Sequence, residues 1–498
     1  MRLTLFLSFC ACLLLLACDP EREFVTGDAV QLRFEADTLS FDTVFTARGS
    51  ATEVIKVYND NAAPVQIDRI FVEGMTGVTF TFNADGTMGP RAEDVVIWGN
   101  DSIFVFVEAE VDPSAPLERS PFIAEDKLVF ESGNFQQEIV LQAFGQNALY
   151  LNGFRRGVFF QPICESGTFT LPNELPIVIY GSMVIDSCVV QALAGTELYF
   201  HGGLQRNEQI PTRFIDGFII TLADGSLELL GTLDDPIILA TDRLEEGFEE
   251  SAGAYRGLIF GAGSTGNRIE HTEIRNPFVG VQADSLAEVT LESVTITNTA
   301  GAALFTNRAT VSVSNSLFHT NFESTVQTIN GGDLTFDHCT FASYNGSDQV
   351  AMALLNFEER DDIVVGVGAL RARVRNSILA GFDENELFLN DIFRGGEPGA
   401  FDVRIEHSVV RTNQEFLDFA RDSLQITSFY GDVCQGCHNL TFDDPLFADL
   451  REEDYRLDSL SVARDLGEFL PAFPQDLSGN VRDTETPDAG ALEWQPGG

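Results

Sequence analysis

A Cys-x-x-Cys-His motif near the C-terminus is the residue pattern with the most specific chemistry. Cys434 and Cys437 could form thioethers with the two vinyl groups of haem, and His438 could bind its iron. The flanking residues predict a loop, whereas cytochromes carry this motif at a helix end. We therefore favour a disulfide within the loop, or a pair of free thiols, over covalently bound haem c.

Three arginines alternate along one predicted strand, at positions 371, 373 and 375. Because alternate residues of a strand point to the same face, Arg371, Arg373 and Arg375 would form one basic row. This row could bind an anionic sugar, and its members are weak candidates for a catalytic base. Ion pairs with acidic residues on neighbouring strands are the favoured alternative.

Two acidic loops offer carboxylates that could bind Ca²⁺. Asp361 and Asp362 lie in one loop, and Asp383 and Glu384 lie in the other. Oxygen ligands suit Ca²⁺, but neither loop has the ligand spacing of an EF-hand. Solvated acidic residues without a metal are the favoured interpretation, and Ca²⁺ remains an alternative.

The first 17 residues predict a signal peptide. The apolar run from Leu3 to Ala17 would span about 22 Å as a helix, short of the ~30 Å hydrocarbon core of a membrane. Leu15-Leu16-Ala17-Cys18 resembles the lipobox of bacterial lipoproteins. The resemblance implies cleavage before Cys18, acylation of Cys18, and a tether over residues 18–29 that holds the protein on a lipid bilayer. An ordinary signal peptide is the alternative.

The lipoprotein resemblance implies a cell-envelope location, on the outer membrane at either its periplasmic or its surface-exposed face. Acidic residues after Cys18 resemble the surface-export signal of Bacteroidetes lipoproteins, although Asp19 could instead signal inner-membrane retention. This compartment is oxidising, which permits disulfides. Cys164 and Cys188 are 24 residues apart, which is about one turn of the repeat described below. The alternatives are therefore a disulfide between neighbouring turns and two free thiols.

The charge of the chain excludes one class of partner. The sequence has 76 acidic and 30 basic residues, which gives a formal net charge of −46. A nucleic-acid backbone would be repelled by this charge, so we expect no nucleic-acid partner. The partner classes that the charge does not exclude are polysaccharides and surface proteins.

Residues 30–146 alternate between apolar and polar side chains in short segments separated by turn residues. This pattern predicts an antiparallel β-sandwich of about seven strands. The order of its strand and turn motifs, such as Asn59-Asp60-Asn61 before Pro64-Val65-Gln66-Ile67, resembles immunoglobulin-like domains of the ASH and HYDIN type. Domains of this kind usually act as spacers or docking platforms.

A repeat of about 22 residues follows, with the order apolar, polar, His/Asn/Ser, small, variable, apolar. Four copies begin at Ile269, Leu291, Val313 and Phe336, and two more begin at Val374 and Ile405 after longer insertions. Such a repeat predicts a parallel β-solenoid in which equivalent residues stack. We therefore expect the first four residues to form one interior column, and the recurring His271, His338 and His407 to form a polar ladder.

Gly225-Ser226-Leu227-Glu228-Leu229-Leu230-Gly231-Thr232 and Tyr255-Arg256-Gly257-Leu258-Ile259-Phe260 resemble coils of right-handed parallel β-helix proteins of the pectin-lyase-like superfamily. The resemblance implies an all-β fold with a right-handed parallel β-helix over residues 150–430. Residues 431–498 resemble the closing segment of bacterial surface β-helix proteins.

The fold resemblance does not specify an activity. We expect a lipid-anchored, non-catalytic β-helix that binds glycan or a protein partner, or serves as a scaffold. The alternative is a polysaccharide lyase or another carbohydrate-active enzyme that uses the arginine row and Ca²⁺-binding carboxylates. Electron transfer through haem c is a minor alternative.

Overall fold

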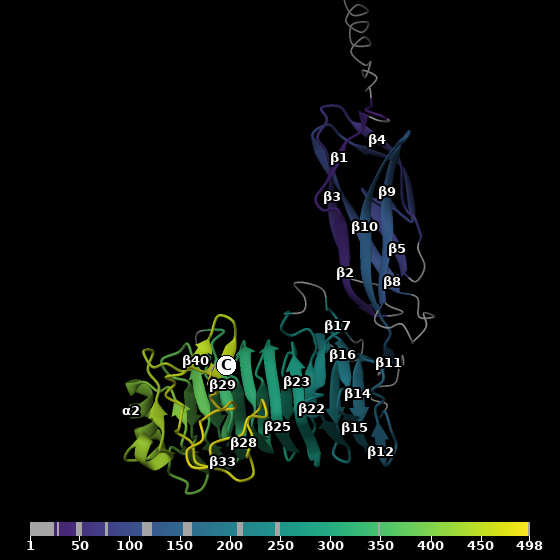
Figure 1. Ribbon diagram of the computed structural model, residues 1–498. Helices are drawn as coiled ribbons and strands as arrows, with labels where there is room; N and C mark the ends of the chain where they lie inside the picture. Colours follow the sequence, from purple (N-terminus) through teal and green to yellow (C-terminus); the bar gives the residue numbers. More distant parts are fainter. Residues whose placement is uncertain are drawn as a thin grey trace, which may run out of the picture. The chain divides into compact units, whose positions relative to one another are not determined.

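The computed structural model describes residues 24–26, 29–45, 52–74, 78–111, 122–152, 162–206, 213–244, 250–346 and 349–496 (Figure 1). The predicted signal peptide and Cys18 lie outside these residues. The chain forms two compact units, divided between Ala148 and Leu149, except that Leu244 groups with the first unit. Among the described residues, no helix combines the length and the apolar character needed to cross a membrane.

The first unit is a β-sandwich of two five-stranded sheets. Its strands alternate between buried and exposed side chains, as in β3 and β5, so each sheet turns one face to a shared apolar core. Neighbouring strands pair antiparallel except β2 and β10, which are parallel. One sheet has the order β1 (Leu32–Phe34), β3 (Glu53–Asn59), β8 (Asp101–Val111), β5 (Val78–Ala84), β6 (Thr87–Met88); the other has β2 (Thr38–Phe45), β10 (Phe135–Gln146), β9 (Phe122–Ser132), β4 (Val65–Val72), β7 (Arg91–Ile97).

The second unit is a parallel β-helix whose strands stack on three faces. Face A contains β12 (Thr168–Thr170), β15 (Val189–Leu193), β20 (Ser226–Leu230), the first parts of β23 (Asn267–Arg275) and β25 (Glu288–Thr299), the second parts of β26 (Leu304–Ser314) and β28 (Val326–Asp337), β33 (Leu370–Arg375), β36 (Phe401–Glu406) and β38 (Cys434–Gln435).

Face B contains β11 (Leu149–Asn152), β13 (Ile177–Tyr180), β16 (Glu197–His201), β21 (Ile237–Thr241), the second parts of β23 and β25, β27 (Leu317–Asn321), β29 (Thr340–Ser343), β34 (Ile378–Gly381), β37 (Val409–Val410) and β39 (His438–Asn439). Face C contains β14 (Ser182–Ile185), β19 (Phe218–Thr221), β22 (Gly257–Phe260), β24 (Val281–Ala283), the first parts of β26 and β28, β30 (Met352–Leu355) and β35 (Leu387–Asn390).

Three hairpins leave these faces: β17 (Gly203–Arg206) with β18 (Arg213–Asp216), β31 (Phe357–Arg360) with β32 (Ile363–Val367), and β40 (Phe447–Asp449) with β41 (Asp454–Leu457). The first two interrupt the repeat between successive coils. The third belongs to the C-terminal segment.

The predicted interior column is present. Ile269 pairs with Leu291, Leu291 with Val313, and Val313 with Phe336, and each of these side chains is buried. The column continues through Val374 and on to Ile405. A single coil could not bury these side chains, but stacked coils bury each one against its equivalents. The predicted fold class, a β-sandwich followed by a parallel β-helix, is confirmed.

The backbone conformation explains why His, Asn or Ser recurs at the third position of the repeat. This explanation was not predicted from the sequence. His271, Ser293, Asn315, His338, Asn376 and His407 all have φ between 41° and 57°. Asn and His tolerate this left-handed conformation better than most residues with a side chain, so the turn between faces A and B selects them. A hydrogen bond joins Asn376 Nδ2 and His338 Nε2 at 2.9 Å, so the polar ladder exists in part.

The next position of the repeat carries a hydroxyl ladder. Ser377 Oγ accepts a hydrogen bond from the backbone N–H of Cys339 and donates one to the carbonyl of Arg375. Ser408 Oγ repeats this pattern one coil later, accepting from Ser377 N–H. Each hydroxyl thus satisfies backbone groups that the turn between faces A and B leaves unpaired.

A helix at the C-terminal end of the β-helix was not predicted. Helix α2 (Gln414–Leu424) lies in the insertion between β37 and β38, and the short η3 (Phe429–Val433) follows it. The side chain of Asn413 caps α2 by accepting from the N–H of Phe416. Phe416 and Ala420 pack into the solenoid core, so the helix closes the open end of that core.

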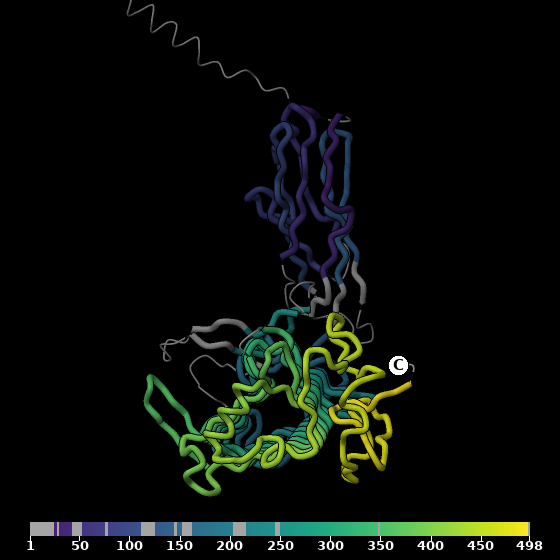
Figure 2. Tube along the Cα trace, turned by 90° about the vertical axis from the view of Figure 1, so that its left-hand side faces the viewer, coloured from purple at the N-terminus to yellow at the C-terminus, as the bar shows by residue number. Residues whose placement is uncertain are grey.

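The C-terminal segment runs along the outside of the later coils (Figure 2). The last coil extends to β39, beyond the expected boundary at residue 430. After it, Asn315 donates a hydrogen bond to the carbonyl of Gln475, and Asn376 both donates to and accepts from the backbone of Glu468. These contacts hold the segment against the side of the solenoid.

Candidate functional site

The arginine row lies on face A and is paired with carboxylates of the neighbouring coils. Arg375 makes a bidentate contact with Asp337, at 2.7 and 2.9 Å, and Arg373 binds Asp402. Arg371 lies 3.7 Å from Asp333. The Arg373 guanidinium holds the pKa of Asp402 below its usual value. The row therefore has the geometry of inter-coil ion pairs.

The acidic loops lie at different corners of the solenoid. Asp361 and Asp362 are exposed at the tip of the β31–β32 hairpin, and their φ angles of 51° and 61° form its tight turn. Asp383 and Glu384 precede β35, at the corner between faces B and C. In the described parts of the chain, no group of three or more His, Cys, Asp or Glu side chains could hold a metal ion.

Both cysteine pairs are joined. Cys164 and Cys188 form a disulfide, and Cys434 and Cys437 form a second one. Haem attachment would need the two sulfurs of the second pair, which are bonded to each other here. His438 lies 3.2 Å from Asp444, and Cys339 is free and buried.

The arrangement best suited to ligand binding lies at the corner between faces B and C, and we call it the corner groove. At this corner Asn276, Asn298 and Thr320 occupy equivalent positions in successive coils, with φ of 66°, 56° and 56°. They line a hollow of about 410 Å³, together with side chains from face B and from flanking loops. The complete lining is Glu250, Arg275, Asn276, Thr297, Asn298, Thr320, Phe322, Asn345 and Glu453.

Hydrogen bonds fix the walls of the corner groove. Asn298 donates to the carbonyl of Glu250, and Thr320 donates to the carboxylate of Glu453 at 2.7 Å. Beside them, burial lowers the pKa of His319 to about 4, so its imidazole is neutral at pH 7 even though Glu453 opposes the shift. The groove is thus polar and largely fixed before any ligand arrives.

The chemistry of the corner groove suits a sugar chain. Amide and hydroxyl groups recur along its lining with the spacing of the coils, about 4.8 Å. Phe322, whose side chain is 53% exposed, offers an apolar ring at the rim. The groove was not predicted because its residues come from six separate parts of the chain. The recurrence of Asn276, Asn298 and Thr320 at a 22-residue spacing was a signal that could have indicated it.

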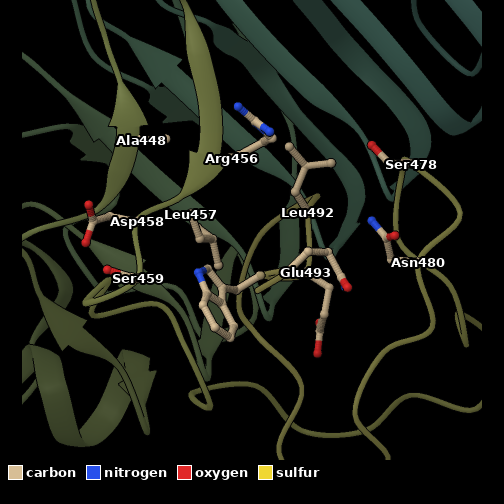
Figure 3. A pocket seen from close by; sticks show the side chains of 11 residues that line it. Ala448, Arg456, Leu457, Asp458, Ser459, Ser478, Asn480, Leu492 and Glu493 are labelled. Atoms are coloured by element: carbon tan, nitrogen blue, oxygen red, sulfur yellow. The ribbon is translucent and has the colours of Figure 1, made fainter. Parts of the chain in front are cut away.

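A second hollow, of about 430 Å³, lies within the C-terminal segment (Figure 3). Its labelled polar side chains include Arg456, Asp458, Ser478 and Asn480. Arg456 is bound to Asp454 through its guanidinium, at 2.6 Å. This hollow does not continue along the repeated coils.

Comparisons with known proteins found similar chains among solved structures. No family model matches the chain, and no curated protein matches it. Among solved structures, the catalytic unit of a thermostable GH87 alpha-1,3-glucanase from Streptomyces thermodiastaticus is similar over 72% of this chain and 73% of its own, with 10% identity and a TM-score of 0.31.

A family 123 glycoside hydrolase from Clostridium perfringens is similar over 23% of this chain, with 8% identity and a TM-score of 0.16. This chain covers 26% of that structure's length. Similarities as low as these carry no information about activity.

Proposed function

We propose that this protein is a lipid-anchored protein of the cell envelope whose β-helix binds a polysaccharide without cleaving it. The observation that supports the proposal is the corner groove, in which amide and hydroxyl side chains repeat from coil to coil. A polysaccharide is itself a repeating chain of hydroxyl-bearing rings. A groove that runs along the coils can therefore contact several of its sugars.

The anchor in this proposal rests on the sequence. Cys18 follows the lipobox-like residues 15–17, and acylation there would hold the protein on the outer membrane. An acidic surface would disfavour anionic polysaccharides, because the net charge of −46 repels them. The favoured ligand is therefore a neutral polysaccharide.

The lyase alternative has less support from the arrangement of side chains. It needs an arginine that can act as a base toward a sugar bound beside Ca²⁺. Arg375 is instead held between both oxygens of Asp337, and its pKa is raised by that hydrogen-bonded carboxylate. A guanidinium stabilised in its charged form is a poor base.

Binding of the full chain to dextran, α-mannan and laminarin, measured by affinity electrophoresis, tests the proposal. We expect retardation by at least one of them, and about tenfold or greater weakening in Phe322→Ala and in Asn298→Gly. Glycine accepts the left-handed backbone of Asn298, so this change removes the amide without adding strain.

Phe393→Ala is the matched control, because Phe393 is 43% exposed but lies after face C and outside the groove. Assays for new reducing ends and for unsaturated products accompany the binding measurement. Absence of binding to all three polysaccharides would overturn the proposal, and so would turnover of any of them.

A further inference from the structure

A second cluster of chemically competent side chains lies at the corner between faces B and C, in earlier coils. His201 ends β16, and Asp242 directly follows β21, the next strand of face B. His201 Nδ1 lies 2.8 Å from Asp242 Oδ2. Asp216 ends β18, in the hairpin that interrupts the coil between β16 and β19.

Two glycines bring the chain segments of this cluster together. A Cβ atom on Gly202 would lie 2.0 Å from the carbonyl oxygen of Ala254, and one on Gly217 would lie 3.2 Å from the carbonyl oxygen of His201. The pairing of Gly203 with Asp216 in the β17–β18 hairpin fixes the register of the same segment. Asp216 is therefore held beside His201 by the backbone.

Each carboxylate of the cluster keeps one oxygen without a partner. Oδ1 of Asp216 and Oδ1 of Asp242 are buried, and neither accepts a hydrogen bond. The Asp216 residue is 8% exposed, and the Asp242 side chain is 9% exposed. A buried acceptor left unpaired costs about 1–3 kcal/mol, so each of these oxygens is expected to take a partner such as water or a ligand hydroxyl.

An aromatic surface adjoins His201. The Tyr180 ring lies 4.8 Å from the His201 ring, and the Tyr150 ring lies 6.0 Å from that of Tyr180. His201 is itself partly exposed, with 36% of its side chain accessible, so the cluster is open to solvent on that side. Rings next to carboxylate acceptors match the two surfaces of a sugar, its apolar face and its hydroxyl edge.

We propose that His201, Asp216 and Asp242 form a subsite for a neutral sugar ring that carries adjacent free hydroxyl groups. The hydroxyls donate to the carboxylates of Asp216 and Asp242, and His201 holds Asp242 in place through Oδ2. An ionised carboxylate only accepts hydrogen bonds, so the site selects a ligand rich in donors. This inference rests on the proposed function and specifies the class of sugar that the same corner of the β-helix recognises.

Cleavage of the ligand's rings between adjacent hydroxyls tests the inference directly. Periodate cleaves the bond between carbons that bear vicinal hydroxyls, and borohydride then reduces the resulting aldehydes. The full chain is titrated with dextran and α-mannan, each native and after this treatment. We expect the treated polysaccharides to bind at least tenfold more weakly, because opening the ring separates the two hydroxyls and leaves them on a flexible chain, where they no longer reach both carboxylates from one rigid ring.

Variants of the chain locate the effect. Asp216→Asn and Asp242→Asn keep the size of each side chain but remove its charge and replace one acceptor oxygen with an NH2 donor, and each is expected to weaken binding of the native polysaccharide at least tenfold. Asp234→Asn, an exposed change in the turn before β21, is the matched control and should bind as the unaltered chain does. Circular dichroism and thermal melting establish that each variant is folded.

The outcomes separate this inference from the proposed function. Binding that is unaffected by periodate treatment, or by both aspartate variants, overturns the subsite while the corner groove remains. Loss of binding in Asn298→Gly, without loss in the aspartate variants, has the same meaning. New reducing ends that disappear in Asp216→Asn would replace the binding subsite with a hydrolytic site and overturn both proposals.

Discussion

Face B of the β-helix has an open part and a covered part, and the same two columns of outward side chains run through both. The first column passes from Glu273 and Thr295 to Ile378 and Val409. The second passes from Arg275 and Thr297 through His319 to Ala342 and Ala380. In both columns, polar residues give way to apolar or small residues where the C-terminal segment begins to cover the face.

The covered part behaves as a second core outside the solenoid. Ile378, Ala380 and Val409 pack against apolar residues of the C-terminal segment, including Leu446, Leu457, Ala463 and Ala489. Gly490 passes so close to Ile378 that an added Cβ would lie 2.7 Å from the Ile378 side chain. The comparison teaches that the polarity of the outward residues of a β-helix indicates whether they face solvent or another segment of the chain.

The largest expected effect comes from Arg482, the buried arginine that fixes the C-terminal segment. Its guanidinium is fully buried and donates to Asn315 Oδ1, to the carbonyl oxygens of Gly490 and Ala491, and to Glu493. We expect Arg482→Ala to lower the free energy of unfolding by about 3–5 kcal/mol, because Glu493 is left buried without its partner.

Urea unfolding measures this loss, and limited proteolysis should show earlier cleavage within residues 446–496. Arg451→Ala, at an exposed position, is the control. Equal stability of the two variants would mean that the segment is not held by this arginine.

Thr340 and Thr295 lie in the first outward column of face B, one in the covered part and one in the open part. Replacing each of them compares the stability of the two parts. Thr340 Oγ1 accepts a hydrogen bond from the N–H of Ala491 at 3.0 Å, whereas Thr295 lies in the open part of the same column. Thr340→Val should cost about 1–3 kcal/mol, because a buried N–H loses its acceptor. Thr295→Val should stay within about 0.5 kcal/mol. Similar changes in melting temperature for both variants would contradict the proposed difference between the covered and open parts of face B.

Glu386 lies at the corner between faces B and C, just before β35. The pH dependence of the free energy of unfolding tests whether its carboxyl group is protonated in the folded chain. Its carboxylate accepts from the backbone N–H groups of Ala351 and Asp383, yet burial raises its pKa to about 8. The native state therefore holds a proton that the unfolded chain releases near pH 4.5. Stability should fall as pH rises from about 4.5 to 8, by at most about 1.4 kcal/mol per pH unit.

Urea titrations at several pH values measure this slope. Glu386→Gln should be less stable at low pH, since its amide nitrogen faces a backbone donor, but its slope across the same window should be flatter. Glu384→Gln, at an exposed neighbouring position, should keep the slope of the unaltered chain. An unchanged slope in Glu386→Gln would mean that another titrating group causes the pH dependence of stability.

Much of the fold could be predicted because its cause is local and repeated. Ile269, Leu291, Val313 and Phe336 recur at a nearly constant spacing, and only stacking can bury them all. Helix α2 was missed because it occurs once, between two strands of the repeat, and its role depends on the open core that it covers. The apolar residues on both sides of β34 were a signal that something covers face B, since a strand buried on both sides lacks alternation.

The candidate sites were less predictable than the fold. The arginine row was found by its spacing, and its pairing with Asp337 and Asp402 agrees with the favoured alternative of ion pairs. The corner groove and the His201 cluster were not found. Their residues are brought together by a left-handed turn and by inserted loops, and neither has a residue motif.

The sequence by itself determined the repeat, its interior column, and the residues that accept the left-handed turns, because these depend on neighbours along the chain and on a fixed periodicity. Only the tertiary structure decided which outward residues are covered and which polar groups meet. Asn315 and Arg482 are 167 positions apart, and His201 and Asp242 are 41 apart. Contacts over such separations depend on the paths of the intervening loops and of the C-terminal segment, and residue spacing does not encode those paths.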